Sequence, residues 1–132
     1  MPNRGYKSPH IYHIAHSMAT QIHAMTFKLP KFEFYEEGSQ IRRSSKAIWS
    51  NIVEGFARRR YKNDFLEYLI YALSSCDETR EHLDTLYETK SLTDENLFVL
   101  LSRTCDELGR TLNKFIQAVD VGHLTLRNHS VK

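Results

Sequence analysis

The sequence predicts an all-α protein, an up-down-up-down antiparallel four-helix bundle. Glycine and proline are scarce, with five and three residues in a chain of 132, so the chain lacks the turn residues of a strand-rich fold. The apolar residues recur instead at intervals of three and four, as they do along one face of a helix. Four such stripes follow one another with short connections, and short connections make neighbouring helices antiparallel.

The first two expected helices cover residues 10–28 and 36–59. The apolar stripe of the first consists of Ile11, Ile14, Met18, Ile22 and Met25. The stripe of the second consists of Ile41, Ser45, Ile48, Ile52 and Phe56. Pro30 closes the first helix, because a residue that precedes proline is disfavoured in the helical conformation.

The last two expected helices cover residues 63–90 and 93–120. Their stripes consist of Phe65, Leu69, Ala72, Leu73, Cys76, Leu83, Leu86 and Tyr87, and of Leu97, Leu101, Thr104, Leu108, Leu112, Phe115 and Val119. Asn63 and Thr93 begin these helices, each followed by an acid that suits the positive end of the helix dipole. We expect one domain over 10–121, with flexible ends at 1–9 and 122–132.

Charge is strongly segregated along the chain, although the formal net charge is only +2. Residues 41–62 carry seven cations and one acid, whereas residues 63–107 carry three cations and eleven acids. Such a distribution suits contact with a polyanion or head-to-tail packing between subunits. The candidate nucleic-acid contacts are Arg42, Arg43, Lys46, Arg58, Arg59, Arg60 and Lys62. The alternative is that these cations pair with the acidic third helix of the same or a neighbouring subunit.

The first helix has an unusual surface, because residues 8–27 contain no Lys, Arg, Asp or Glu. Histidine, serine, threonine and glutamine make this segment too polar for a bilayer. A helix without a charged face is usually covered on a second side, so we expect a homo-oligomer. The second helix carries Trp49 and Val53 beside its core stripe, and these are the candidate interface residues. The alternative is that the neutral polar side chains solvate the first helix well enough.

No pattern of residues indicates catalysis or a cofactor. Asn51 and Glu54 share a helical face, but no histidine or second carboxylate lies within helical reach, so a structural polar clamp is expected rather than acid-base chemistry. His10, His13, His16 and His23 lack acidic or cysteine neighbours that would complete a metal site, and are expected to face solvent or an interface. Cys76 and Cys105 are expected to be buried, reduced thiols in the cytoplasm.

Several short motifs resemble one known family. They are FKLP at 27–30, SQIRR at 39–43, NIVEGF at 51–56, FLEYL at 65–69 and SSCDE at 74–78. The chain resembles the four-helix bundle proteins encoded in intervening sequences of 23S ribosomal RNA genes of bacteria. A related branch is the accessory variability determinant of diversity-generating retroelements.

The resemblance implies a closed ring, typically a homopentamer, with a basic surface that binds nucleic acid and no established enzymatic activity. We therefore expect a non-enzymatic, oligomeric, cytoplasmic protein that needs no cofactor and binds nucleic acid, with structured RNA as the expected ligand. The alternative function is an adaptor whose main partner is a reverse transcriptase. Base specificity does not follow from these residues.

Overall fold

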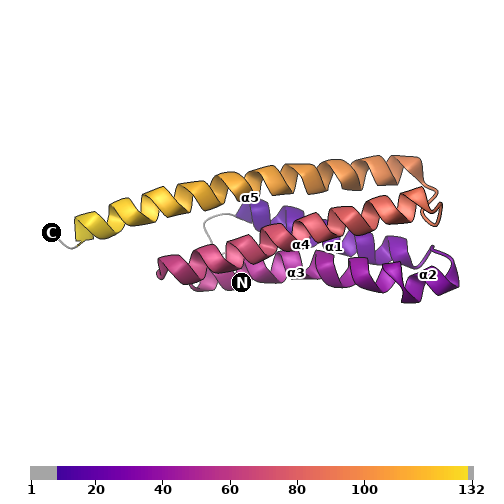
Figure 1. Ribbon diagram of the computed structural model, residues 1–132, viewed down its shortest axis with the longest axis horizontal. Helices are drawn as coiled ribbons and strands as arrows, with labels where there is room; N and C mark the ends of the chain where they lie inside the picture. The colour runs from indigo at the N-terminus through magenta and orange to yellow at the C-terminus, as the bar shows by residue number, and fades with distance from the viewer. Residues whose placement is uncertain (1–8, 131–132) are drawn as a thin grey trace.

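The computed structural model describes residues 9–130, and the side chains of residues 10–122 (Figure 1). Within that range the protein is all-α, as predicted, and contains five helices, four of them long. They are α1 (Pro9–Thr26), α2 (Lys31–Tyr35), α3 (Glu37–Ala57), α4 (Lys62–Glu88) and α5 (Glu95–Ser130). Helix α3 packs on α1 and α4, and α5 packs on α4 and α1. Successive long helices run in opposite directions, and α5 extends past the others at its C-terminal end (Figure 1).

The core consists of the apolar stripes that define the helices. Met18 and Ile22 of α1 are fully buried, as are Ile48 of α3, Leu83 of α4 and Leu108 of α5. The remaining fully buried large side chains are Ile11, Ile41, Ile52, Leu69, Leu86, Leu101 and Leu112. Each helix thus buries one face, which leaves its other faces for polar contacts and for binding.

Most helix ends lie within two residues of those expected, and two differences are larger. The chain turns into the short helix α2 after Pro30, where one connection was expected, and Glu36 separates α2 from α3 with φ −104° and ψ −97°. At the other end, the fourth expected helix was to finish at residue 120, whereas α5 continues to Ser130; the expected flexibility of residues 122–130 stays a prediction. The only glycine there is Gly122, which costs a helix roughly 1 kcal/mol, and no proline follows to stop it. Residues 1–8 and 131–132, also expected to be flexible, lie outside the described residues.

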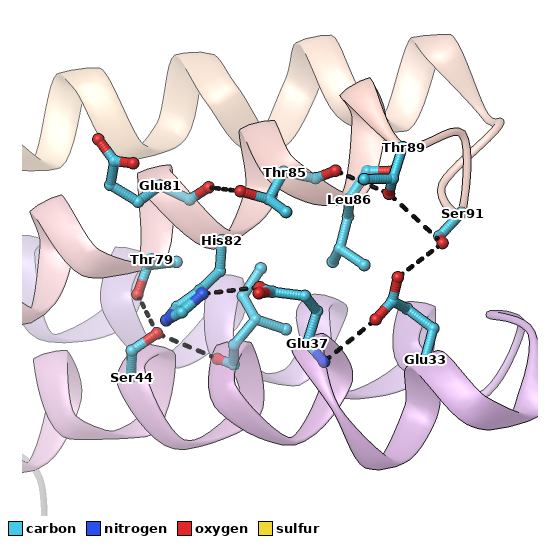
Figure 2. Close-up of polar contacts among 11 residues, drawn as sticks. Glu33, Glu37, Ser44, Thr79, Glu81, His82, Thr85, Leu86, Thr89 and Ser91 are labelled. Carbon is cyan, nitrogen blue, oxygen red and sulfur yellow. Dashed lines mark hydrogen bonds and ion pairs between the residues drawn. The ribbon is translucent and has the colours of Figure 1, made fainter.

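Polar contacts tie the α2–α3 junction to α4 (Figure 2). The buried Glu33 carboxylate accepts hydrogen bonds from the Ser91 hydroxyl, at 2.8 Å, and from the backbone N–H of Glu37, at 3.3 Å. The side chain of Glu37 lies 2.7 Å from Nδ1 of His82 on α4. Burial removes water from the Glu33 carboxylate, and its two hydrogen bonds replace the water contacts that are lost.

Arg80 connects α4 with α5. Its Nε donates to Asp84 at 3.2 Å, and its Nη1 donates to the carboxylate of Asp106 and to the backbone oxygen of Ser102, the latter at 3.4 Å. Two acids of α4 and α5 are therefore paired with a cation that belongs to the acidic third helix itself. Arg80 is not one of the seven cations of the basic segment.

Candidate nucleic-acid interface

The turn between α3 and α4 presents the arginine cluster at the surface. Helix α3 ends at Ala57, and the N–H of Arg58 donates to the carbonyls of Glu54 and Gly55. Arg58, Arg59 and Arg60 are all exposed. The carbonyl end of a helix carries partial negative charge, which favours cations at this place. Arg59 interacts with this helix end directly, because its Nη1 donates to the Phe56 carbonyl at 2.8 Å.

Arg58 and Lys62 form ion pairs with carboxylates of the same chain. Arg58 pairs with the Glu54 carboxylate on the same helix, and its guanidinium lies over the Tyr68 ring, 5.1 Å from the ring centroid. Lys62 lies 2.9 Å from Asp120 of α5, with only 17% of its side chain exposed. Neither carboxylate lies on α4, so these two pairs differ from the pairing with the acidic third helix that was the structural alternative for the basic segment.

The three cations in the middle of α3 differ sharply from one another. Arg42 is half-buried: its Nη1 donates to the Thr26 hydroxyl at 3.0 Å, its Nη2 donates to the Phe34 carbonyl at 3.2 Å, and its guanidinium stacks 4.0 Å from the Phe34 centroid. Arg43 and Lys46 are exposed. Arg42 therefore fastens α2 to the rest of the fold, whereas Arg43 and Lys46 face solvent.

Asn51 and Glu54 were expected to form a polar clamp near Gly55. Asn51 is half-buried, but Glu54 is exposed and its partner is Arg58, one turn further along α3. An exposed pair at this spacing contributes about 0.3–0.5 kcal/mol, much less than a buried clamp. Gly55 does lie at a close approach of helices, because a Cβ there would be 3.3 Å from Cβ of Tyr68 on α4.

The candidate interface residues Trp49 and Val53 are both half-buried. The Trp49 ring packs against two rings of α1, with centroid distances of 6.0 Å to Tyr12 and 5.3 Å to His16. Part of the surface expected to meet another subunit is thus covered by the chain itself. The assignment of these residues to a subunit contact stays a prediction.

The four histidines of α1 do not form a metal centre. His10, His13 and His16 are exposed and His23 is half-buried. Nowhere in the described part of the chain do three His, Cys, Asp or Glu side chains converge as ligands. His16 and His23 instead line a groove beside Trp49.

None of the helices described between residues 9 and 130 is long and apolar enough to cross a bilayer.

Sequence reasoning missed the contacts of Glu33, Glu37 and His82, and those of Arg80. The partners of Glu33 and Glu37 lie 58 and 45 positions away, so no local spacing points to them. These contacts hold helices together and involve none of the seven cations of the basic segment.

Comparison with known proteins agrees with this architecture. A solved structure from Bacteroides thetaiotaomicron VPI-5482, described as a protein with unknown function from the S23 ribosomal protein family, is 25% identical and has a TM-score of 0.72. The match covers 85% of this chain and 99% of that one. No match was found among curated proteins. The sequence profile of the 23S rRNA-intervening sequence proteins matches residues 7–114. The chain belongs to the family of 23S rRNA-intervening sequence proteins.

Proposed function

We propose that the protein is a non-enzymatic nucleic-acid-binding protein and that its ligand is RNA. The observation that carries this proposal is the exposure of Arg43, Lys46, Arg59 and Arg60 on α3 and the turn after it. Among the described residues, neither Arg43 nor Lys46 takes part in an ion pair. Exposed guanidinium groups bind phosphates in a bidentate manner. The family name, which refers to ribosomal RNA, supports RNA over other polyanions.

A titration of the protein with short RNA over a range of salt concentrations tests the proposal. Each phosphate contact releases counterions, so affinity falls steeply with salt, with a slope of about −0.7 per contact on a single strand. We expect salt-dependent binding by the natural protein. If no RNA binds even at low salt, the proposal is wrong.

Charge-matched variants locate the contacts. The test variant combines Arg43→Gln, Arg59→Gln and Arg60→Gln. The control combines Arg103→Gln, Arg110→Gln and Lys114→Gln, which remove the same charge from exposed positions of α5. We expect the test variant to bind RNA more weakly, with a salt slope shallower by about 2, and the control to bind nearly as the natural protein does. Equal losses in both would show that net charge, rather than this surface, decides binding.

We further propose that the four long helices form an antiparallel bundle and that the chain assembles into a homopentameric ring. Ile70 and Tyr71 on α4 and Leu100 on α5 support association, since they are 51%, 47% and 51% exposed and an apolar surface gains from being covered. A ring repeats the basic surface, so weak contacts act together through effective concentration. The mass from light scattering tests this, and a monomeric mass at working concentration would overturn it.

We infer a bacterial, cytoplasmic protein. Cys76 and Cys105 are free and buried, which fits a reducing compartment, and the related solved structure is of bacterial origin. Fractionation of the host cell tests this, and recovery outside the cytoplasm would contradict it.

An adaptor that binds a reverse transcriptase is the second candidate function. The observation that favours it is the exposure of three aromatic residues just after α1 and in α2, with Phe27 at 63%, Phe32 at 65% and Tyr35 at 67%. Aromatic side chains are enriched in protein interfaces. The RNA titration separates the two functions, because the adaptor requires no salt-dependent affinity for RNA.

A further inference from the structure

A groove of 340 Å³ lies between α1 and α3. Its lining consists of His16, Ala19, Thr20, His23, Lys46 and Trp49. No carboxylate is among these residues, so a negatively charged ligand meets no repulsion from the lining. The volume lies at the lower end of the range of about 300–1,000 Å³ for small-molecule sites. The groove therefore has room for one planar ring system with a charged group beside it.

Three of the lining residues carry rings: His16 and His23 on α1, and Trp49 on α3. Further rings support them, because Trp49 contacts the rings of Tyr12 and His16, and His23 contacts Phe27 with a centroid distance of 5.2 Å. Phe27 in turn lies 5.2 Å from Phe34. Rings of this kind provide faces on which an unpaired base stacks, whatever its sequence.

The polar groups of the groove suit a nucleotide as well. Trp49 lines the groove, and its Nε1 is buried without a hydrogen-bond partner among the described residues, which costs free energy. The neighbouring His16, whose ring contacts Trp49, is exposed. Lys46, also exposed, provides a positive charge at the same place.

We propose that the groove between α1 and α3 binds an unpaired nucleobase of the RNA, with a neighbouring phosphate at Lys46. This inference rests on the proposed function and names the part of the RNA that the protein selects. A base in a duplex is stacked and paired, so it does not enter such a groove, whereas a base in a loop or bulge does. The competing occupant is a second copy of this chain, which the position of Trp49 also allows.

Trp49 is the only tryptophan of the chain, so its fluorescence reports on the groove alone. We would titrate the protein with short labelled oligouridylate and measure label anisotropy and tryptophan emission together. Emission should change over the same RNA concentrations that raise the anisotropy. An abasic oligomer of the same length should raise the anisotropy without that change.

The outcomes separate the two proposals. Binding of oligouridylate with no change in emission, or the same change with the abasic oligomer, overturns the groove and leaves the proposed function in place. Absence of any rise in anisotropy at low salt overturns both.

A pair of variants makes the same test without fluorescence. Thr20→Glu places a carboxylate in the groove, and Ser74→Glu adds the same charge at an exposed position of α4. We expect Thr20→Glu to weaken oligouridylate binding by about fivefold or more, which corresponds to one lost base stack, while Ser74→Glu has a smaller effect. Equal effects in two variants of unchanged helicity overturn the groove. A fall in the mass of the RNA-free Thr20→Glu protein would show that the groove is a subunit contact instead.

Discussion

Glu37, in the first turn of α3, and His82, on α4, meet side chain to side chain with 2.7 Å between Oε1 and Nδ1 (Figure 2). The two side chains are 28% and 23% exposed, so water competes only partly for this contact. The backbone of Glu37 is also held, because its N–H donates to Glu33, which accepts from Ser91 beyond the end of α4. One chain of contacts thus fixes where α3 begins relative to α4.

Replacing His82 with alanine should lower the free energy of unfolding by about 1 kcal/mol, the net worth of a typical hydrogen bond. A double-mutant cycle with Glu37→Ala, measured by urea denaturation, should give a coupling of about 0.5–1.5 kcal/mol. Glu36→Ala is the control, since Glu36 is exposed one position away, and it should change stability by less than about 0.5 kcal/mol. A coupling near zero would show that the two side chains do not support one another.

Gly38 and Gly109 should respond to alanine in opposite directions. Alanine normally stabilises a helix by about 1 kcal/mol relative to glycine. At Gly109 the nearest atom, Cδ1 of Leu73, would lie 4.0 Å from the new Cβ, so we expect stabilisation. At Gly38 the Cβ would lie 2.9 Å from the carbonyl oxygen of Glu33 and 3.3 Å from Nη1 of Arg42, so we expect a loss of about 1–3 kcal/mol from overpacking.

Urea denaturation of the two glycine variants checks this prediction. The natural protein is the common reference, and each alanine variant is the control for the other. A similar gain in stability in both variants would mean that the α2–α3 junction relaxes easily around a methyl group.

The sequence predicted the long helices well because each buries a stripe of period 3.6, as Ile48 and Ile52 show by being almost fully inaccessible to solvent. It did not predict the short helix α2 or the break at Glu36, which depend on contacts with distant parts of the chain. The candidate site shows the same limit. Arg42 and Arg43 are adjacent in sequence, yet only Arg42 meets Phe34 and Thr26, so only the folded structure separates a structural cation from an exposed one.

Arg80→Gln should destabilise the contact between α4 and α5. Arg80 donates to Asp84, Asp106 and the Ser102 carbonyl, but a third of its side chain is exposed, so we expect a loss of only about 1 kcal/mol in the free energy of unfolding. The difference from the natural protein should shrink at high salt, because salt screens exposed charges.

Urea denaturation at low and high salt measures the effect of Arg80→Gln. Arg103→Gln is the control: Arg103 is exposed on α5 and takes part in no ion pair within the described residues. An equal loss in both variants, or a loss that does not change with salt, would contradict an electrostatic role for Arg80.

The thiols of Cys76 and Cys105 should react slowly in the folded protein. Each residue is 2% exposed, and Cys76 Sγ donates to the Cys105 carbonyl at 3.3 Å. The side-chain contact between the two thiols, together with burial, raises the pKa of Cys105, whereas the same contact lowers the pKa of Cys76. The thiolate is the reactive form, so slow reaction of Cys76 has to come from its burial. Because both side chains are buried, an aromatic disulfide reagent at mildly alkaline pH should modify both thiols only as the protein opens.

The release of the coloured leaving thiol measures this reaction. Ser74→Cys is the control, because it adds a third thiol at an exposed position of α4, and that thiol should react at least about tenfold faster than the two native ones. In denaturant all thiols should react at similar rates, because burial and the local hydrogen bonds are lost. If the native thiols matched the added one in the folded protein, the α4–α5 interface would have to open far more often than its packing and the Arg80 contacts allow.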